Sequence, residues 1–405
     1  MSRGISTFEP ERLKQALAAR RLSQVQLASM VGVSPSTVSK WRAGQQTPTA
    51  EVLERLANVI NVGAEWFTRP AFSRGSTPLF RSNASAHVAA RSMLEARLDW
   101  AREMSEKLEE FVDYPRLNLP ERDFRNPEEI TDQDIEEAAT ECRDLWRLGR
   151  APIPDLALAV EGAGVILVRE ETGVPQIEGL SAWNAVGDRP FILLSADKDN
   201  GFRSRFDLAH ELGHLILHKH IPKATERERH KLMESQAHRF AGAFLLPQES
   251  FLGEIKTPVT LDSLLLSKQR WGVSVAAIIM RLVALDIVSD QEKIYLFKRR
   301  SARWGAKSEP YDNSRKPELP RVLRRTIEML VNEGIITLES IPGHIGLSKS
   351  DIEMLAGLPV GYLEGGASVF ELATLRRPGT EKKITGGKSP TSPAKVLEFS
   401  NRSKC

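Results

Sequence analysis

The sequence has few cysteines and few aromatic residues. Only two of the 405 residues are cysteine, and 6% are aromatic. Because Cys142 and Cys405 lie far apart, they form no disulfide framework, and this usage fits a reducing cytoplasm. Residues 1–4 lead into a polar segment that lacks the apolar core of a signal peptide. We therefore expect a cytoplasmic protein.

The sequence also lacks a strong excess of one charge and a long apolar run. The formal net charge of +3 is too small to indicate a nucleic-acid binder, so any affinity for DNA has to come from a local patch. The longest apolar stretch, residues 273–285, is interrupted by Arg281 and is too short to span a bilayer. We expect no membrane contact. The length predicts two or three domains, each with its own core.

Changes in the spacing of apolar residues divide the chain into five parts. We predict a helical bundle over residues 1–70, a linker and helical connection over 71–150, a mixed α+β domain over 151–300, a helical region over 301–375 and a disordered tail over 376–405. In the mixed domain, compact apolar runs predict strands, and longer amphipathic patterns predict helices. The expected strands are 165–168, 179–183 and 191–194, and the main helices are 202–218, 226–245, 261–268 and 274–285.

Two short helices joined by a tight turn are predicted at residues 23–30 and 34–42. Ser23 and Gln26 have the spacing of a capping box that opens the first helix. Gly32 permits a sharp turn, and Ser34 caps the second helix. Apolar residues spaced to form one small core accompany these helices: Leu13, Leu17, Leu22, Val25, Leu27, Ala28, Val31, Val33, Val38, Leu53, Leu56 and Ile60.

The second of these helices has the features of a DNA reader. Ser36, Thr37 and Lys40 face outwards near its N-terminus, where short polar side chains suit base edges and phosphates in a major groove. Gln24 and Ser34 are further candidates for contacts with DNA. Any small helical bundle also contains two helices and a turn, so the pattern alone leaves a purely structural role open.

Residues 24–44, Gln-Val-Gln-Leu-Ala-Ser-Met-Val-Gly-Val-Ser-Pro-Ser-Thr-Val-Ser-Lys-Trp-Arg-Ala-Gly, resemble the Cro/C1-type (xenobiotic-response-element) helix-turn-helix family. The resemblance spans residues 13–66. It implies binding to double-stranded DNA, usually as a homodimer on a palindromic site. Such domains are also reused to recognise proteins.

Six of the eight histidines lie between His210 and His238. His210 and His214 are four residues apart, which on a helix puts them about 40° apart on one face, where both can bind one Zn²⁺. Glu211 points to the side of this pair and can hold and deprotonate an attacking water. A solvated helix with two ordinary histidines is the alternative. The apolar flanks argue against it, because unpaired histidines in a buried helix are costly.

The following predicted helix offers a third ligand. Glu234 would complete a site of two histidines and one glutamate with an open position. His238, one turn further along, is a competing ligand or a partner of the site. His218 and His220 are expected to cap the end of the first helix or to face solvent. We expect Gly213 to leave room for backbone or substrate. No substrate-specificity pocket is visible in the sequence.

Residues 205–215, Arg-Phe-Asp-Leu-Ala-His-Glu-Leu-Gly-His-Leu, followed by Glu234-x-x-Ala237-x-x-Phe240-Ala241 and Leu245-Leu246-Pro247, resemble the ImmA/IrrE family of metallopeptidases. The resemblance covers roughly residues 156–285. It implies a zincin-like fold, with a small sheet beside the helix of the motif. It also implies that His210, His214 and Glu234 bind zinc and that Glu211 is the general base. Relatives often have Asn or an acid where this chain has His238.

The sequence thus predicts a multidomain protein: an all-α helix-turn-helix bundle, a mixed α+β zincin-like metallopeptidase domain and a helical C-terminal region. The function it indicates is that of a DNA-binding zinc endopeptidase that cleaves a repressor or antitoxin-like regulator. One alternative is a non-proteolytic transcriptional regulator whose zincin-like domain senses metal or a partner. Another is an antitoxin that binds a toxin through its C-terminal half. Glu211 weighs against a purely structural metal site, which needs no base.

Overall fold

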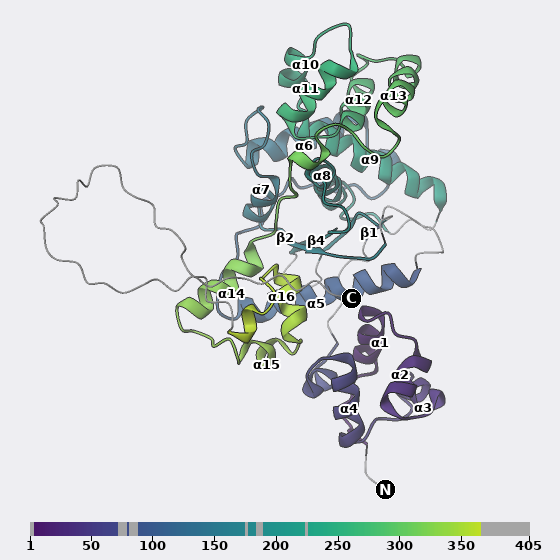
Figure 1. Ribbon diagram of the computed structural model, residues 1–405, viewed down its shortest axis with the longest axis vertical. Helices are drawn as coiled ribbons and strands as arrows, with labels where there is room; N and C mark the ends of the chain where they lie inside the picture. The colour runs from purple at the N-terminus through teal and green to yellow at the C-terminus, as the bar shows by residue number, and fades with distance from the viewer. Residues whose placement is uncertain are drawn as a thin grey trace, which may run out of the picture. The chain divides into compact units, whose positions relative to one another are not determined.

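The computed structural model describes residues 4–71, 79–80, 88–174, 177–183, 189–222 and 226–365. The predicted tail over 376–405 lies outside the described residues, as do residues 72–78 and 81–87 of the predicted linker and helical connection. Figure 1 shows a mainly helical chain with one small sheet in its middle part. Among the described residues, none of the helices combines the length and the hydrophobicity needed to span a lipid bilayer.

The N-terminal bundle has the predicted helix-turn-helix. Ser23 and Gln26 form both hydrogen bonds of the capping box, and Gly32 ends the first helix with a φ of 77°. Ser34 Oγ accepts a hydrogen bond from the backbone N–H of Thr37 (3.1 Å). One core prediction is wrong: Val25 is 59% exposed, because it lies on the outer face of its helix. The elements are α1 (Pro10–Ala19), α2 (Gln24–Val31), α3 (Pro35–Arg42), α4 (Ala50–Ile60) and the 3-10 helix η1 (Ala64–Thr68).

The connection between the bundle and the mixed domain contains two helices and, unexpectedly, a short strand. Strand β1 (Leu79–Phe80) lies inside the segment predicted as a linker. Helix α5 (Val88–Glu109) is buried along most of its length, and α6 (Asp132–Leu145) begins with a capping box at Thr131. The short 3-10 helix η3 (Pro127–Glu129) precedes α6.

A four-stranded mixed sheet forms the centre of the second domain, in the order β1-β3-β4-β2. The short helix α7 (Leu156–Gly162) leads into β2 (Ile166–Glu170). Strand β3 (Gly179–Trp183) pairs antiparallel with β4 (Pro190–Ser195), which pairs parallel with β2. The three strands fall where the apolar runs predict them, because nearly every side chain in them is buried on one face or the other.

Helix α8 (Gly201–Leu217) packs on one face of the sheet against β3 and β4, and α9 (Arg227–Leu245) packs against α8. The side chain of Asn200 caps α8 by accepting hydrogen bonds from two backbone N–H groups of the first turn. Four further helices follow, of which the first and last are not predicted from the sequence: α10 (Gln248–Glu254), α11 (Leu261–Trp271), α12 (Val275–Ala284) and α13 (Asp290–Trp304).

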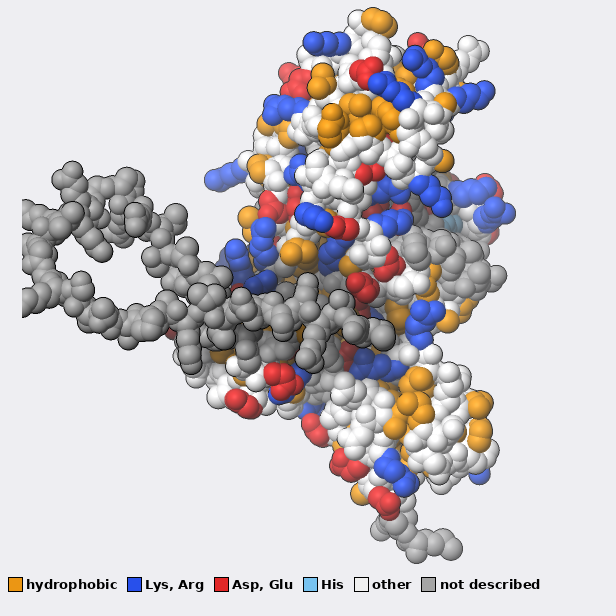
Figure 2. Space-filling model, in the orientation of Figure 1, with side chains coloured by type: hydrophobic (Ala, Val, Ile, Leu, Met, Phe, Trp, Pro, Cys, Tyr) orange, Lys and Arg blue, Asp and Glu red, His pale blue; other side chains and the backbone are white. Residues whose placement is uncertain are grey.

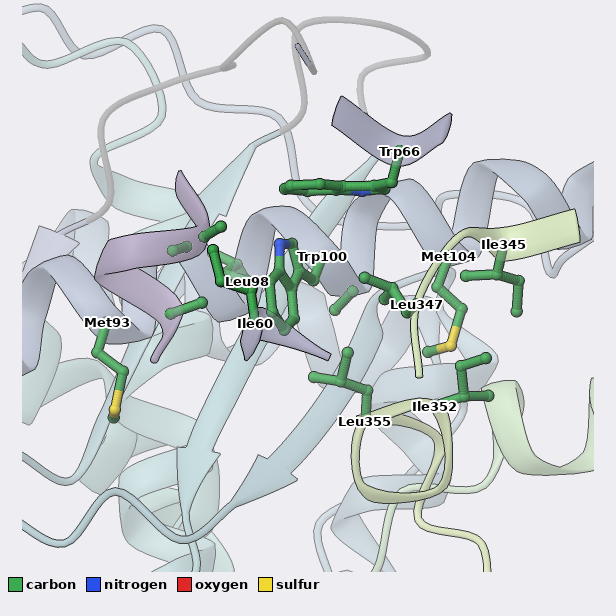
Figure 3. Close-up of a cluster of buried hydrophobic side chains, with 14 of the residues drawn as sticks. Ile60, Trp66, Met93, Leu98, Trp100, Met104, Ile345, Leu347, Ile352 and Leu355 are labelled. Carbon is green, nitrogen blue, oxygen red and sulfur yellow. The ribbon is translucent and has the colours of Figure 1, made fainter. Parts of the chain in front are cut away.

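The other face of the sheet is covered by α5 and by helices of the C-terminal region. The presence of these helices confirms the helical prediction for that region. These elements share one hydrophobic core with the N-terminal bundle, as Figure 3 shows for Trp66, Trp100 and Leu355. The C-terminal elements are η4 (Asp312–Ser314), α14 (Val322–Asn332), α15 (Ile341–Ile345), α16 (Lys349–Ala356) and η5 (Tyr362–Glu364).

Buried ion pairs reinforce this shared core. Arg97 on α5 contacts Glu170 of β2 at 2.7 Å and Asp351 of α16 at 2.5 Å. Arg20, just after α1, pairs with the same Asp351 at 2.5 Å. A separate pair joins Arg12 to Glu103 at 2.6 Å. The helix-turn-helix bundle is therefore attached to α5 by a buried ion pair and to α16 by a pair in which Asp351 is buried and Arg20 is partly exposed.

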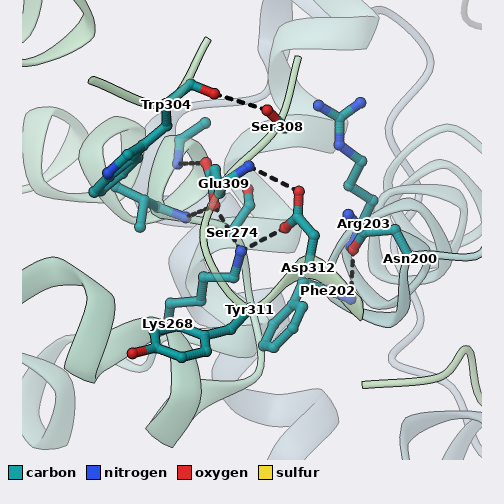
Figure 4. Close-up of polar contacts among 12 residues, drawn as sticks. Asn200, Phe202, Arg203, Lys268, Ser274, Trp304, Ser308, Glu309, Tyr311 and Asp312 are labelled. Atoms are coloured by element: carbon teal, nitrogen blue, oxygen red, sulfur yellow. Dashed lines mark hydrogen bonds and ion pairs between the residues drawn. The ribbon is translucent and has the colours of Figure 1, made fainter. Parts of the chain in front are cut away.

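The segment after α13, residues 305–318, connects several helices of the mixed domain, and we call it the strap. Glu309 is buried and pairs with Lys268 of α11 (3.0 Å), as Figure 4 shows. Its carboxylate pairs with Arg300 of α13 as well (2.9 Å). It also caps α12 by accepting a hydrogen bond from the backbone N–H of Val275 (2.8 Å). Further along, Glu318 pairs with Arg205 of α8. These contacts fix α8 and α12 in place.

Candidate metal centre

Two adjacent helices bring the three predicted ligands together. His210 and His214 lie one turn apart on α8, and their Nε2 atoms are 3.1 Å apart. Glu234 reaches across from α9, with its carboxylate oxygens 3.4 Å from Nε2 of His210 and 3.3 Å from Nε2 of His214. One potential ligand atom from each of the three residues lies within 4.8 Å of the others. Two imidazoles and a carboxylate are a donor set that Zn²⁺ takes in peptidases.

Gly213 allows α8 and α9 to approach closely. A Cβ atom at this position would lie 3.1 Å from Cβ and from Cδ1 of Phe240 on α9. The space beside Gly213 is therefore filled by an aromatic ring, and not by backbone or substrate as predicted. The close packing of the two helices is what brings Glu234 within reach of the histidines.

A chain of hydrogen bonds behind His214 fixes its orientation. Nδ1 of His214 lies 2.9 Å from Nδ1 of His218, and Nε2 of His218 lies 3.1 Å from Oε1 of Gln236. The amide nitrogen of Gln236 donates to the carbonyl of Pro127 (2.6 Å). His218 is the C-cap residue of α8, as predicted, but its side chain is buried and does not face solvent.

The direction of this chain follows from its last acceptor. A carbonyl oxygen can only accept, so the amide nitrogen of Gln236 faces it and Oε1 accepts from Nε2–H of His218. Nδ1 of His218 is then an acceptor, and Nδ1–H of His214 donates to it. This assignment leaves a lone pair on Nε2 of His214, directed at Glu234 and His210, which is the form that binds a metal.

Burial keeps His210 and His218 neutral, whereas contacts with histidines keep Glu234 charged. Burial lowers the pKa of His210 to about 3, although Glu234 partly opposes this effect, and burial also lowers the pKa of His218 to about 3. Burial alone would raise the pKa of Glu234, but the contacts with His210 and His214 outweigh it and lower that pKa. Two neutral imidazoles and a carboxylate with converging lone pairs form a site that fits a divalent cation.

Glu211, the predicted base, extends from α8 toward the sheet. Its side chain is buried and lies against Gly179 at the start of β3. A Cβ atom at Gly179 would lie 3.3 Å from Oε1 of Glu211 and 3.1 Å from the carbonyl oxygen of Leu193. The glycine thus leaves the room that the glutamate needs beside the metal ligands.

His238 borders the metal group but is not part of it. Its Nδ1 lies 2.7 Å from the backbone oxygen of Glu234, and its ring packs against that of His210 with centroids 4.3 Å apart. Of the two candidates for third ligand, the geometry favours Glu234. His220 is exposed. His230, which the sequence reasoning did not single out, has Nε2 3.9 Å from Oε1 of Glu234.

The predicted DNA-contacting residues lie on and around α3. Ser36 and Lys40 are exposed, whereas Ser34 uses its hydroxyl to cap the helix and lies 2.8 Å from Oγ1 of Thr37. Gln24 on α2 accepts a hydrogen bond from Arg42 at the end of α3 (3.1 Å). Arg42 is thereby fixed beside the predicted surface. On the visible face of the molecule, basic and acidic side chains are interspersed (Figure 2).

Two family models match this chain, one in each of the two predicted functional domains. Residues 13–67 match the family model described as helix-turn-helix, and residues 160–283 match the one described as the IrrE N-terminal-like domain, a peptidase family. The chain carries an ImmA/IrrE-like peptidase domain. The matched stretch contains His210, His214 and Glu234 together with Glu211. The two domains occur in the predicted order, with the Cro/C1-type domain first.

Inside the ImmA/IrrE-like domain, the sequence predicts the metal ligands and the base but not the residues that hold them in position. Gln236 and Gly179 carry no chemical signature of their own. Gln236 becomes recognisable only when α9 is docked on α8, and Gly179 only when β3 is laid beside Glu211. The one available signal was the spacing of His218, four residues after His214, which puts both on one helix face.

Proposed function

We propose that this protein is a DNA-binding, zinc-dependent endopeptidase that cleaves a repressor or antitoxin-like regulator and thereby controls transcription. The observation that carries the proposal is the convergence of His210, His214 and Glu234 beside the buried Glu211, in a chain that also carries a helix-turn-helix domain. A protein with DNA as its partner is expected to work in the cytoplasm.

The chemistry follows from what each side chain can do. Zinc bound by the three residues would supply a Lewis acid that polarises the scissile carbonyl. Glu211 accepts the proton of the attacking water and delivers it to the departing amine, which is the work of a general base and then of a general acid. The hydrogen-bond chain through His218 keeps the lone pair of His214 directed at the site. Gly179 keeps Glu211 uncrowded.

The DNA-binding part would bring the peptidase to its target. Helix α3 presents Ser36 and Lys40 to solvent, and Arg42 and Gln24 lie at its side, where they can contact phosphates. We propose that a homodimer binds a palindromic operator with α3 in the major groove. A repressor bound at or near the same operator would then be cut where it acts.

The test compares the wild type with Glu211→Gln. Both proteins are assayed for zinc content and for cleavage of candidate repressors from the same genome, with intact mass analysis of the products. We expect both to hold one zinc ion per chain and only the wild type to cleave. Equal zinc content without cleavage by either protein, in vitro and in cells, would contradict the peptidase proposal.

That negative outcome would favour the second candidate, a transcriptional regulator that senses metal or a partner without cleaving it. One observation supports this candidate: Asp351 pairs with both Arg20 beside α1 and Arg97 on α5, so the DNA-binding bundle is tightly attached to the rest of the chain. A sensor needs such an attachment, whereas a tethered peptidase does not.

A further inference from the structure

A cavity of about 570 Å³ lies beside the metal group, between α8, α9 and α12. Its volume is in the range of ligand-binding pockets. The walls come from helices far apart in sequence and include Ile135, Phe206, His238, Gly242, Ala276 and Met280. The cavity is therefore a product of the tertiary fold, which explains why the sequence offers no sign of it.

His238 connects this cavity to the metal centre. Its imidazole lines the cavity and also packs against the ring of His210, with centroids 4.3 Å apart, and against Phe206 at 5.8 Å. On α9, His238 stands one turn after Glu234, so the two side chains lie on the same face of the helix. His238 therefore contacts both the cavity and one of the predicted metal ligands.

The lining is suited to an uncharged apolar group. Aliphatic and aromatic side chains from α6, α8, α9 and α12 form much of the wall, and Met280 is 51% exposed there. Three of the four arginines in the wall have carboxylate partners. Arg281 pairs with Glu136 at 2.5 Å, Arg239 with Asp132 at 3.0 Å, and Arg300 with Glu309 at 2.9 Å.

A charged ligand that bound to one of these three paired arginines would have to displace its carboxylate partner and would gain little in return. Glu309 also lines the cavity. Figure 4 shows its contacts with Lys268 and with the backbone at the start of α12. Arg203 lies in the wall near the same strap and donates a hydrogen bond to the backbone oxygen of Lys307 (3.2 Å). An apolar side chain, by contrast, is favoured simply by leaving water.

We infer that this cavity is the specificity pocket of the peptidase and takes a large apolar side chain, such as Phe, Leu or Met, of the residue next to the scissile bond. The inference rests on the proposed function, since it names the substrate feature that the metal site would act on. It assigns the discrimination between substrates to Phe206, Ala276 and Met280 and not to the metal ligands.

The test uses small zinc-binding probes that differ only in their side chains: the hydroxamates of N-acetylphenylalanine, N-acetylglycine and Nα-acetyl-lysine. Binding to the zinc-loaded full chain is measured by calorimetry. We expect the phenylalanine compound to bind at least about tenfold more tightly than the other two, as is typical for an apolar group entering a fitted pocket. Equal affinities, or a preference for lysine, would overturn the inference.

Two variants locate the preference in the cavity. Ala276→Trp and Met280→Trp fill the pocket from α12, and Leu266→Trp makes a similar change at a position that is 67% exposed on α11 and outside the wall. The first two should abolish the preference for phenylalanine while zinc content stays at the wild-type level, and the third should retain it. A preference that survives both filling variants would also overturn the inference. A chain that binds no zinc would instead count against the proposed function, so the two failures are distinguishable.

Discussion

Removal of the His218 imidazole should weaken zinc binding although His218 is not a ligand. The proposed change is His218→Leu. It leaves Nδ1 of His214 and Oε1 of Gln236 without the partners that they have at 2.9 Å and 3.1 Å. Both atoms belong to buried residues, so water cannot readily replace the lost hydrogen bonds.

The size of the effect follows from these two losses. A buried polar group left unsatisfied costs about 1–3 kcal/mol, so the metal-free protein should lose a few kcal/mol of unfolding free energy. The imidazole of His214 is then no longer held in the tautomer with a lone pair on Nε2. Loss of such a supporting contact typically lowers metal affinity about 10–100-fold, and we expect a loss in this range.

The assay is competition for zinc against a chromophoric chelator, together with urea unfolding in the presence of excess chelator. His220→Leu is the matched control, because it makes the same substitution at a histidine that is exposed. Gln236→Glu tests the direction of the chain, since it replaces the amide donor that faces the Pro127 carbonyl at 2.6 Å with an acceptor. If His218→Leu binds zinc as tightly as His220→Leu does, the assigned tautomer and the role of His218 are refuted.

Three further changes test other contacts. Asp351→Ala removes the carboxylate that the buried Arg97 shares with the partly exposed Arg20, and we expect a loss of about 3–5 kcal/mol in urea unfolding; a loss below 1 kcal/mol would contradict the network around Asp351. Gly179→Ala should crowd Glu211 and lower kcat at unchanged zinc content, whereas Gly253→Ala, with open space around it, should have no such effect; equal rates would show that the contact is unimportant. Burial raises the pKa of Glu161 to about 7 from 4.5, so its contribution to stability is present below pH 4.5 and lost as pH rises through 7. Relative to Glu161→Gln, the wild type should lose about 3 kcal/mol between pH 4.5 and 8 in denaturation at each pH, and parallel curves would refute the shift.

The sequence predicts best the features that depend on residues close together in the chain. The helix-turn-helix follows from the caps at Ser23 and Ser34 and from the turn at Gly32, all of which act within a few residues. The same holds for α8, where four-residue spacing puts His210 and His214 on one face. The metal group adds only one long-range step, the packing of α9 on α8.

What the sequence does not predict depends on how distant elements dock. Helix α13 is missed because it is strongly charged and buries only Leu296 and Arg300. The exposure of Val25 depends on which face of α2 meets the other helices. The cavity beside the metal group is built from several helices and the strap, so no local pattern encodes it.

The shared core determines how DNA binding should be tested. Trp66 at the end of the N-terminal bundle packs edge-to-face on Trp100 of α5, with centroids 6.0 Å apart. Deletion of the bundle would expose this surface and remove Arg20 from its pair with Asp351. Such a truncation would therefore damage the sheet side of the peptidase domain as well as abolish DNA binding. A change at Lys40, which is exposed on α3, removes a predicted contact with DNA and leaves the core intact. Only a variant of this second kind can separate recognition of an operator from cleavage of the protein bound to it.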